Sequence, residues 1–250
     1  MTNASSGVEI FDVRRIRFVE KAWHPISEPD RLTMERAWSE AVQENPNLFD
    51  GPTVACMDVE WKEPGSLILS WARAAYRYRM LRQIPDAPSV SSVFVCVAQP
   101  TEDGRLLVAR MSSSTSTPGR WQLPGGSMEP PLRGESLDVA PLRRHAAREL
   151  MEELGIDPLP ESLSLWVVTR GARGSVGFVF RAPALPAEFL HQRFAALVSS
   201  EQEQGRASEL DRIALIDSEA ELSFLAGEQV DYLQPIVRRN FEFSASSGSA

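Results

Sequence analysis

The sequence predicts an α/β protein in which a mixed sheet lies between layers of helices, an α/β/α sandwich with a small α+β N-terminal subdomain. Residues 93–97 form a near-continuous apolar run that suits a central strand. Residues 141–154 have the apolar spacing of a helix, and Gly155 stands where a left-handed C-terminal cap is expected. We therefore expect a subdomain over residues 1–88, a main domain over residues 89–242 and a disordered tail over residues 243–250.

The N-terminal subdomain is expected to combine short strands with one long helix. Ser27 is expected to cap this helix, and Asn45-Pro46-Asn47 ends it. A basic segment follows the strands and is expected to be helical, and residues 85–89 are a natural linker. Residues 1–7 are small and polar, so we expect disorder there. The expected elements are strand 13–19, helix 27–43, paired strands 54–61 and 67–69, and helix 71–82.

The main domain shows a clearer alternation of strands and helices. Turn residues such as Glu102-Asp103-Gly104 separate the apolar runs, and Gly171 and Gly174 lie in an expected hairpin loop. The expected elements are strands 92–98, 106–110 and 121–123, helix 141–154, hairpin strands 163–169 and 176–181, helix 186–198, polar loop 199–207, strand 212–216 and helix 230–240.

The composition is that of a soluble globular protein. The chain is 43% hydrophobic and 24% charged, and it contains neither a membrane-length apolar run nor a signal segment. Cys56 and Cys96 are its only cysteines, which favours buried reduced thiols in a cytoplasmic protein. The net charge of −8 argues against a broad nucleic-acid surface. We therefore expect a cytoplasmic protein with neither a membrane nor a nucleic-acid partner.

Three glutamates on the helix over residues 141–154 carry the strongest chemical signal. Glu149, Glu152 and Glu153 have the i, i+3, i+4 spacing that places side chains on one helix face. Their mutual repulsion is relieved either by solvation, as on an ordinary acidic surface, or by a bound cation. Mg²⁺ commonly uses a few carboxylates together with water and substrate phosphate. Arg148 could pair with Glu152 or hold Glu149 in place.

Residues 148–155 resemble the second half of the Nudix signature. They read Arg-Glu-Leu-Met-Glu-Glu-Leu-Gly and lie downstream of Pro124-Gly125-Gly126, which closes a strand as in that family. A chance match at five fixed positions is on the order of one in a million per starting residue. The resemblance implies a Nudix fold and a hydrolase acting on a nucleoside diphosphate linked to another moiety.

The same resemblance implies a divalent metal, Mg²⁺ or Mn²⁺, and assigns roles to individual residues. Glu149, Glu152 and Glu153 would be metal ligands, and the Gly125 carbonyl could be another. Either Glu149 or Glu153 would help to deprotonate the attacking water, which makes these two and Arg148 the candidate catalytic residues.

The chain departs from the signature in the loop before the helix. The family has a glutamate eight positions before the arginine, where this chain has Ala140. The nearest Gly-Glu pair is Gly134-Glu135, so the loop is longer than usual. Either Glu135 or Glu129 could complete the site, and either could equally be a plain surface carboxylate. This distortion leaves a second function open: a module that binds or senses a nucleotide with little turnover.

A weaker resemblance concerns the substrate. Residues 38–52, together with Pro-Gly-Gly-x-x-Glu-Pro at residues 124–130, are similar to parts of UDP-sugar Nudix pyrophosphatases, such as those acting on UDP-glucose. This resemblance implies a UDP-sugar as one candidate substrate. Two cysteines are too few for the four-cysteine zinc module of NADH-type members. Dimers are common in the family, so a homodimer is a further expectation.

Several other residues are candidates for the site, each with a simpler structural alternative. Trp121 could contact a base but fits a core position, Glu209 could be a late catalytic glutamate or a solvated charge, and His145 shares the helix face of Glu149. Another candidate is Arg120, which lies shortly before the turn Pro124-Gly125-Gly126, called the glycine turn below. The last candidates form a basic stripe: Arg73, Arg77 and Arg79 with Tyr76 and Tyr78.

Overall fold

Strand β5 (Ser91–Ala98) is the centre of the larger sheet in this computed structural model, which describes residues 7–23, 25–87 and 90–247. Its Val93, Val95 and Val97 are fully buried, as the apolar run predicts. β5 pairs in parallel with β9 (Val176–Arg181) and antiparallel with β3 (Pro52–Glu63). The seven strands follow the order β1-β8-β9-β5-β3-β4-β2. The others are β1 (Glu9–Phe11), β2 (Arg15–Glu20), β4 (Ser66–Ala75) and β8 (Ser164–Arg170).

A second sheet of three strands lies beside the first. Its order is β10-β6-β7, with β10 (Leu210–Ile216), β6 (Leu106–Met111) and β7 (Trp121–Gln122) all paired antiparallel. The chain leaves β7 and runs along β5 through residues 124–128, so the glycine turn connects the two sheets.

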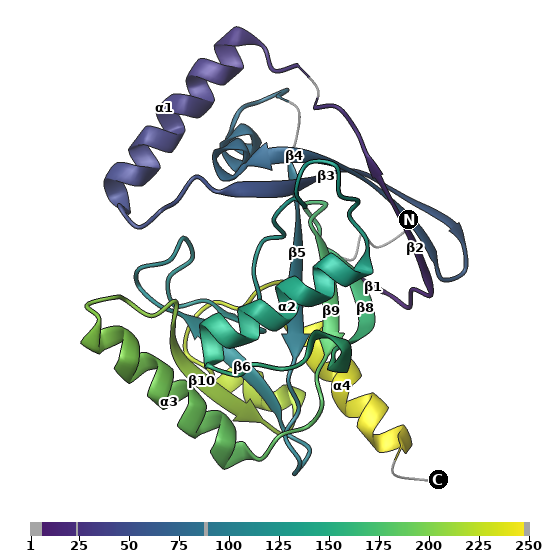
Figure 1. Cartoon of the computed structure of the whole chain (residues 1–250), viewed down its shortest axis with the longest axis vertical. Helices are drawn as coiled ribbons and strands as arrows, with labels where there is room; N and C mark the ends of the chain where they lie inside the picture. Colours follow the sequence, from purple (N-terminus) through teal and green to yellow (C-terminus); the bar gives the residue numbers. More distant parts are fainter. Residues whose placement is uncertain (1–6, 24, 88–89, 248–250) are drawn as a thin grey trace.

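Helices cover both faces of the sheets. Helix α2 (Val139–Leu154) and helix α3 (Ala187–Glu203) pack on the face of Val93, Val95 and Val97. Helix α4 (Leu233–Ser247) packs on the opposite face, against Cys96 and Val179. Figure 1 shows α2 in front of β5 and β9, with α4 on the lower right. The predicted α/β/α sandwich is therefore confirmed.

The N-terminal part adds a helical layer above this domain (Figure 1). Helix α1 (Glu28–Glu44) begins at the expected N-cap, because the Ser27 side chain accepts a hydrogen bond from the Asp30 N–H at 3.2 Å. It packs with the 3₁₀ helix η1 (Tyr76–Gln83) around Met34 and Leu81. β3 also pairs with β5, so the sheet continues across the expected boundary near residue 88, and the division at that point stays a prediction.

Three predicted segments differ in the structure. The segment 71–82 is not one helix, because β4 continues to Ala75 beside β2 and β3 before η1 begins. Helix α3 continues to Glu203, through half of the expected polar loop. Helix α4 runs to Ser247, where a tail from residue 243 was expected. Residues 1–6 of the expected N-terminal disorder, and residues 248–250, lie outside the described residues.

Three smaller observations complete the fold. Two short 3₁₀ helices, η2 (Pro160–Ser162) and η3 (Glu219–Phe224), join the larger elements. Cys56 and Cys96 are buried free thiols, as expected. Within the described part of the chain, no helix has both the length and the apolar character needed to cross a membrane.

Candidate functional site

Helix α2 presents the three glutamates in unequal environments. Its start is capped by Asp138, which accepts a hydrogen bond from the Ala140 N–H at 2.7 Å, and it ends at Gly155 with φ of 68°. An apolar stripe on this helix, including Leu150 and Leu154, is buried against the sheet. The stripe turns Glu153 inward to an exposed fraction of 2%, whereas the side chain of Glu152 is 60% exposed.

The glycine turn forms the wall opposite α2. The Val97 N–H donates to the Pro124 carbonyl at 2.8 Å, and the Val95 N–H donates to the Gly126 carbonyl at 3.0 Å. A Cβ atom on Gly125 would lie 2.2 Å from the Val95 carbonyl oxygen, and its φ is 147°. Only glycine fits this position, because a side chain would overlap the backbone of β5.

Glu153 is a buried carboxylate with one unsatisfied oxygen. Its Oε2 accepts a hydrogen bond from the Gly125 N–H at 2.7 Å, while Oε1 has no hydrogen-bond partner. Burial, followed by the charges of Glu149 and Glu209, raises its pKa well above the ordinary value, and the Gly125 hydrogen bond opposes this shift. Such a group binds a proton more readily than an ordinary glutamate, and its free oxygen can hold a cation.

Glu149 lies between the glycine turn and a buried histidine. A Cβ atom on Gly126 would lie 2.7 Å from Glu149 Oε1, so the carboxylate packs directly on the turn. The same Oε1 is 2.9 Å from His145 Nε2, although the alignment is too poor for a hydrogen bond. Arg148 Nη2 lies 2.7 Å from His145 Nδ1 and 2.7 Å from Glu129 Oε1. Since arginine can only donate, His145 Nδ1 accepts and its Nε2–H faces Glu149.

Two more carboxylates lie near this pair. The pKa of Glu152 is raised by desolvation and by Glu149, while Arg148, 3.8 Å away, lowers it. The pKa of Glu209 is raised by desolvation and by Glu149 and Glu152. The Ser112 N–H donates to the Glu209 carbonyl at 2.8 Å, so the β6–β10 pairing brings this late glutamate to α2. Glu209 is exposed, so its part in the site stays a prediction.

The two loop glutamates have different surroundings. Glu129 pairs with Arg148 at the edge of the site. Glu135 is exposed and accepts one hydrogen bond, from the Leu132 N–H at 3.3 Å, within its own loop. The longer loop thus leaves Glu135 outside the carboxylate group. The Gly125 carbonyl has only a 3.5 Å contact with Gln122 Nε2.

The donor chemistry fits a hard divalent cation. Burial and neighbouring carboxylates raise the pKa values of Glu152, Glu153 and Glu209, and Oε1 of Glu153, which accepts no hydrogen bond from the described residues, is a buried oxygen donor. Among the described residues, no three His, Cys, Asp or Glu side chains are close enough together to hold a metal ion.

The other sequence candidates divide into structural and open groups. Trp121 is 1% exposed and its Nε1–H donates to the Ala226 carbonyl at 3.0 Å, which makes it a core residue. Arg73 and Arg77 form ion pairs with Glu20 and Asp50. Arg79 instead stacks on Tyr76, with 4.5 Å from its guanidinium carbon to the ring centre, and Tyr78 packs edge-on against Trp23.

The sequence analysis did not identify two further arginines, Arg82 and Arg173, in the same region as Arg79. Their charges affect the same cluster, since Arg82 lowers the pKa of Arg79 and Arg173 lowers that of Arg82. Arg173 lies in the Gly171–Gly174 loop, which is a weak signal, and no pattern in the sequence identifies Arg82.

Comparisons with known proteins identify a family. The family model described as NUDIX domain matches residues 88–235. No curated protein matches the chain. Among solved structures, MutT protein from Methanosarcina mazei Go1 is 21% identical with a TM-score of 0.40, covering 64% of this chain and 96% of that one. A NUDIX hydrolase from Nitrosomonas europaea is 20% identical with a TM-score of 0.36, covering 63% and 90%.

A third solved structure is a bifunctional NMN adenylyltransferase/ADP ribose pyrophosphatase from Francisella tularensis, complexed with AMP and a Mn ion. It is 20% identical with a TM-score of 0.38, covering 64% of this chain and 43% of that one.

Proposed function

The chain belongs to the NUDIX domain family and is a Nudix hydrolase, and from this premise we propose that it is a divalent-metal-dependent pyrophosphohydrolase. Its substrate is a nucleoside diphosphate linked to another moiety, and water cleaves the diphosphate linkage into two phosphorylated products. The net charge of −8 supports a small nucleotide, in place of a nucleic acid, as the partner.

The observation that carries this proposal is the state of Glu153. A carboxylate that is 2% exposed, keeps one oxygen without a partner and lies among other carboxylates is costly to the fold. Such a cost is expected at a functional site and has no packing purpose, because a buried leucine or glutamine would avoid it.

The α2 carboxylates would hold the metal. Glu149, Glu152 and Glu153, with the Gly125 carbonyl, are the proposed ligands, and the divalent cation, Mg²⁺ or Mn²⁺, would neutralise phosphate charge and lower the pKa of bound water. Either Glu149 or Glu153 accepts the proton of the attacking water, and the raised pKa makes Glu153 a stronger base than an ordinary glutamate. Water oxygen attacks one phosphorus atom, and the bridging oxygen leaves on the other phosphate.

Arg148 acts on this site through His145. It is a positioning residue, because its contacts are with His145 Nδ1 and Glu129, while the other histidine nitrogen faces Glu149. This chain of contacts orients the Glu149 carboxylate toward the glycine turn.

The test is phosphate release, coupled to a phosphatase, from a substrate panel with Mg²⁺ or Mn²⁺. The panel contains UDP-glucose, ADP-ribose, NADH, diadenosine polyphosphates and nucleoside triphosphates. We expect metal-dependent turnover of one class, reduced at least about 100-fold in Glu153→Gln and Glu152→Gln. Turnover of UDP-glucose above the others would support the N-terminal resemblance to UDP-sugar enzymes.

A second function is favoured by one observation, the position of Glu135 outside the carboxylate group. With this ligand displaced, the domain would bind or sense a nucleotide and turn it over slowly. Nucleotide binding by calorimetry with no hydrolysis of any panel member would establish this alternative and overturn the enzymatic proposal.

A further inference from the structure

A cavity of about 610 Å³ separates the N-terminal part from the main domain. Its walls come from the end of α1, from η1, from the loop between β6 and β7, and from the β8–β9 hairpin. A volume of this size is within the range that accommodates small-molecule ligands. We call this cavity the arginine cleft, after Arg79, Arg82 and Arg173, which line it.

Three arginines line the arginine cleft and Arg120 lies near Arg79, and within the described part of the chain none of the four pairs with a carboxylate. Arg79 and Arg82 come from η1, Arg120 precedes β7, and Arg173 comes from the β8–β9 hairpin. Desolvation, Arg82 and Arg120 lower the pKa of Arg79, while desolvation and Arg173 lower that of Arg82, so the four charges lie close together. Arg120 Nε is buried and has no hydrogen-bond partner.

Among the described residues, the absence of a carboxylate partner distinguishes these four arginines from neighbouring ones. Arg77, within the same 3₁₀ helix, is 3.0 Å from Asp50, and Arg73 is 2.9 Å from Glu20. Among the described residues, none of the four arginines forms an ion pair with a carboxylate, although Glu44 also lines the cavity. Four uncompensated guanidinium groups repel one another and would be neutralised by an anionic ligand.

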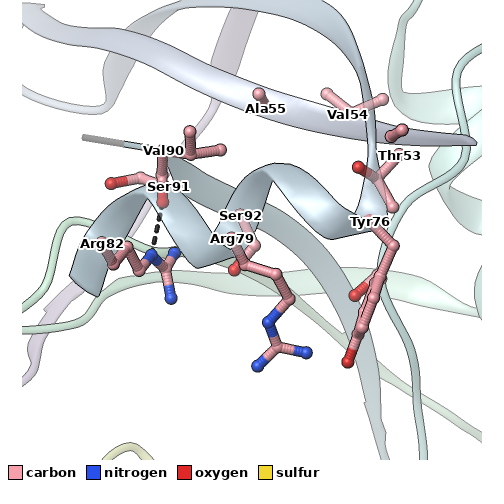
Figure 2. Close-up of a pocket in the computed structure, with 11 residues that line it drawn as sticks. Thr53, Val54, Ala55, Tyr76, Arg79, Arg82, Val90, Ser91 and Ser92 are labelled. Carbon is pink, nitrogen blue, oxygen red and sulfur yellow. Dashed lines mark hydrogen bonds between the residues drawn. The ribbon is translucent and has the colours of Figure 1, made fainter. Parts of the chain in front are cut away.

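The cleft walls are held in place by their own contacts. The Tyr76 hydroxyl donates to Ser116 Oγ at 3.0 Å, and Asn45 Nδ2 donates to the Thr115 carbonyl at 2.9 Å. Arg82 Nε donates to the Val90 carbonyl at 2.5 Å, which directs its terminal nitrogens to the side that Arg79 also faces (Figure 2). Ordering these groups therefore requires little further cost when a ligand binds.

The cleft adjoins the α2 carboxylates through two short backbone connections. Ser127 lines a smaller recess with Arg79 and Arg82, and it directly follows Gly126, on which Glu149 packs. The β6–β7 loop also spans both places: its Ser112 bonds the backbone of Glu209, and its Ser116 lines the cleft. The arginines and the carboxylates are therefore linked through adjoining backbone segments.

We propose that the arginine cleft binds a chain of at least three phosphate groups, each phosphate paired with one or two of Arg79, Arg82 and Arg173 and of Arg120 beside them. This proposal rests on the proposed function where it names the substrate: a nucleotide with three or more phosphate groups. A diphosphate diester such as UDP-glucose carries only two negative charges and would leave the guanidinium groups incompletely neutralised.

The test measures binding of inorganic tripolyphosphate by calorimetry, with pyrophosphate and phosphate in parallel. It uses the full chain with Glu153→Gln in EDTA, so hydrolysis plays no part. Arg79→Gln and Arg173→Gln are each compared with Arg77→Gln, which makes the same charge change within η1 at an arginine already paired. Arg173 is exposed on a hairpin, so its loss leaves the core intact.

We expect tripolyphosphate to bind more tightly than pyrophosphate, and phosphate weakest. Arg79→Gln and Arg173→Gln should each weaken the tripolyphosphate affinity about tenfold, and Arg77→Gln less than about twofold. Equal weakening in all three variants would mean a general charge effect and would overturn the proposal, as would equal affinity for pyrophosphate. The two proposals can fail separately. If tripolyphosphate binds as expected but the wild type hydrolyses no nucleotide of the panel, only the proposed function is overturned. If the wild type hydrolyses a nucleotide but Arg79→Gln and Arg173→Gln bind tripolyphosphate as tightly as the unsubstituted arginines do, only the proposal for the arginine cleft is overturned.

Discussion

The α2 carboxylates and the arginine cleft each gather side chains of like charge, but they are built differently. Glu149 and Glu153 are held by one helix and one glycine turn, which are continuous short segments. The four arginines come from three segments that are distant in the sequence, and their cavity lies between the N-terminal part and the main domain.

This difference has consequences for the energetics of each region. Burial raises the pKa of Glu153, so the repulsion between this carboxylate and its neighbours depends on pH. Arginine stays protonated across the physiological range, so the cleft keeps its charge at any working pH. A bound cation reduces the repulsion among the carboxylates, and a bound anion reduces the repulsion among the arginines. A complex of a metal ion with a nucleotide contains both charges.

The largest effect on stability is expected from a substitution in the glycine turn beside the carboxylates. Gly125→Ala would place a Cβ atom 2.2 Å from the Val95 carbonyl oxygen at a φ of 147°. We expect a loss of about 4 kcal/mol in the free energy of unfolding, measured by urea titration. Gly134→Ala is the matched control, since its φ is 91° but no atom lies within 4 Å of the added Cβ. The control should lose about 1 kcal/mol, and equal losses would contradict the close-packing argument.

The sequence predicts the carboxylate region better than the arginine cleft, because the carboxylates lie on one short segment and the arginines on distant ones. The spacing of Glu149, Glu152 and Glu153 correctly indicates one helix. The spacing does not reveal that Glu153 is buried while Glu152 is exposed, because this depends on which stripe of α2 meets the sheet.

The arginines are harder to predict because pairing is a tertiary property. Arg73, Arg77 and Arg79 lie in one basic segment, and nothing in the sequence distinguishes them. They differ because β4 extends to Ala75 and then gives way to a 3₁₀ helix, which brings Arg73 to Glu20 and Arg77 to Asp50 but turns Arg79 into the cleft. The sheet pairing that extends β4 lies between segments distant in sequence and outweighs the local helical pattern.

A second prediction separates the two regions by pH. The pKa of Glu153 is raised in the folded protein, so the folded state binds this proton more tightly than the unfolded state. Below the unfolded pKa both states are protonated and the group has no effect. Stability is then lost as pH rises toward the folded pKa. In EDTA, Glu153→Gln should therefore be more stable than the wild type at pH 8, by about 2 kcal/mol, and equal to it near pH 4.

Thermal and urea unfolding across pH 4 to 8, on the order of six points, measure this difference. Arg79→Gln provides the contrast, because its stability difference from the wild type should stay constant over this range. A constant difference for Glu153→Gln as well would show that its carboxylate has the same proton affinity in both states and would contradict the raised pKa.

A third prediction concerns the contacts that orient Glu149. Arg148→Gln removes the donor to His145 Nδ1 and the pairing with Glu129, so the ring loses the contact that defines its tautomer. We expect kcat to fall about tenfold with little change in KM, together with a changed pH–rate profile. Arg144→Gln, an exposed arginine on the same helix, is the control and should leave both unchanged. An unaltered pH profile in Arg148→Gln would exclude the positioning role.

The smallest expected effect tests whether the cleft is preformed. Tyr76→Phe removes the hydroxyl that donates to Ser116 Oγ and keeps the ring on which Arg79 stacks. An exposed hydrogen bond contributes about 0.5 to 1 kcal/mol, so stability should fall only slightly. Tripolyphosphate affinity should fall about threefold, because the β6–β7 loop must then be ordered on binding.

Tyr78→Phe is the matched control, since its ring packs edge-on against Trp23 and its hydroxyl has no hydrogen-bond partner among the described side chains. If both variants bind tripolyphosphate as the wild type does, the Tyr76–Ser116 contact has no part in ligand binding, and the affinity comes from charge alone. If only Tyr76→Phe weakens binding, the cleft resembles the carboxylate region in one respect: its charges are held in position before the ligand arrives, although three segments are needed to hold them.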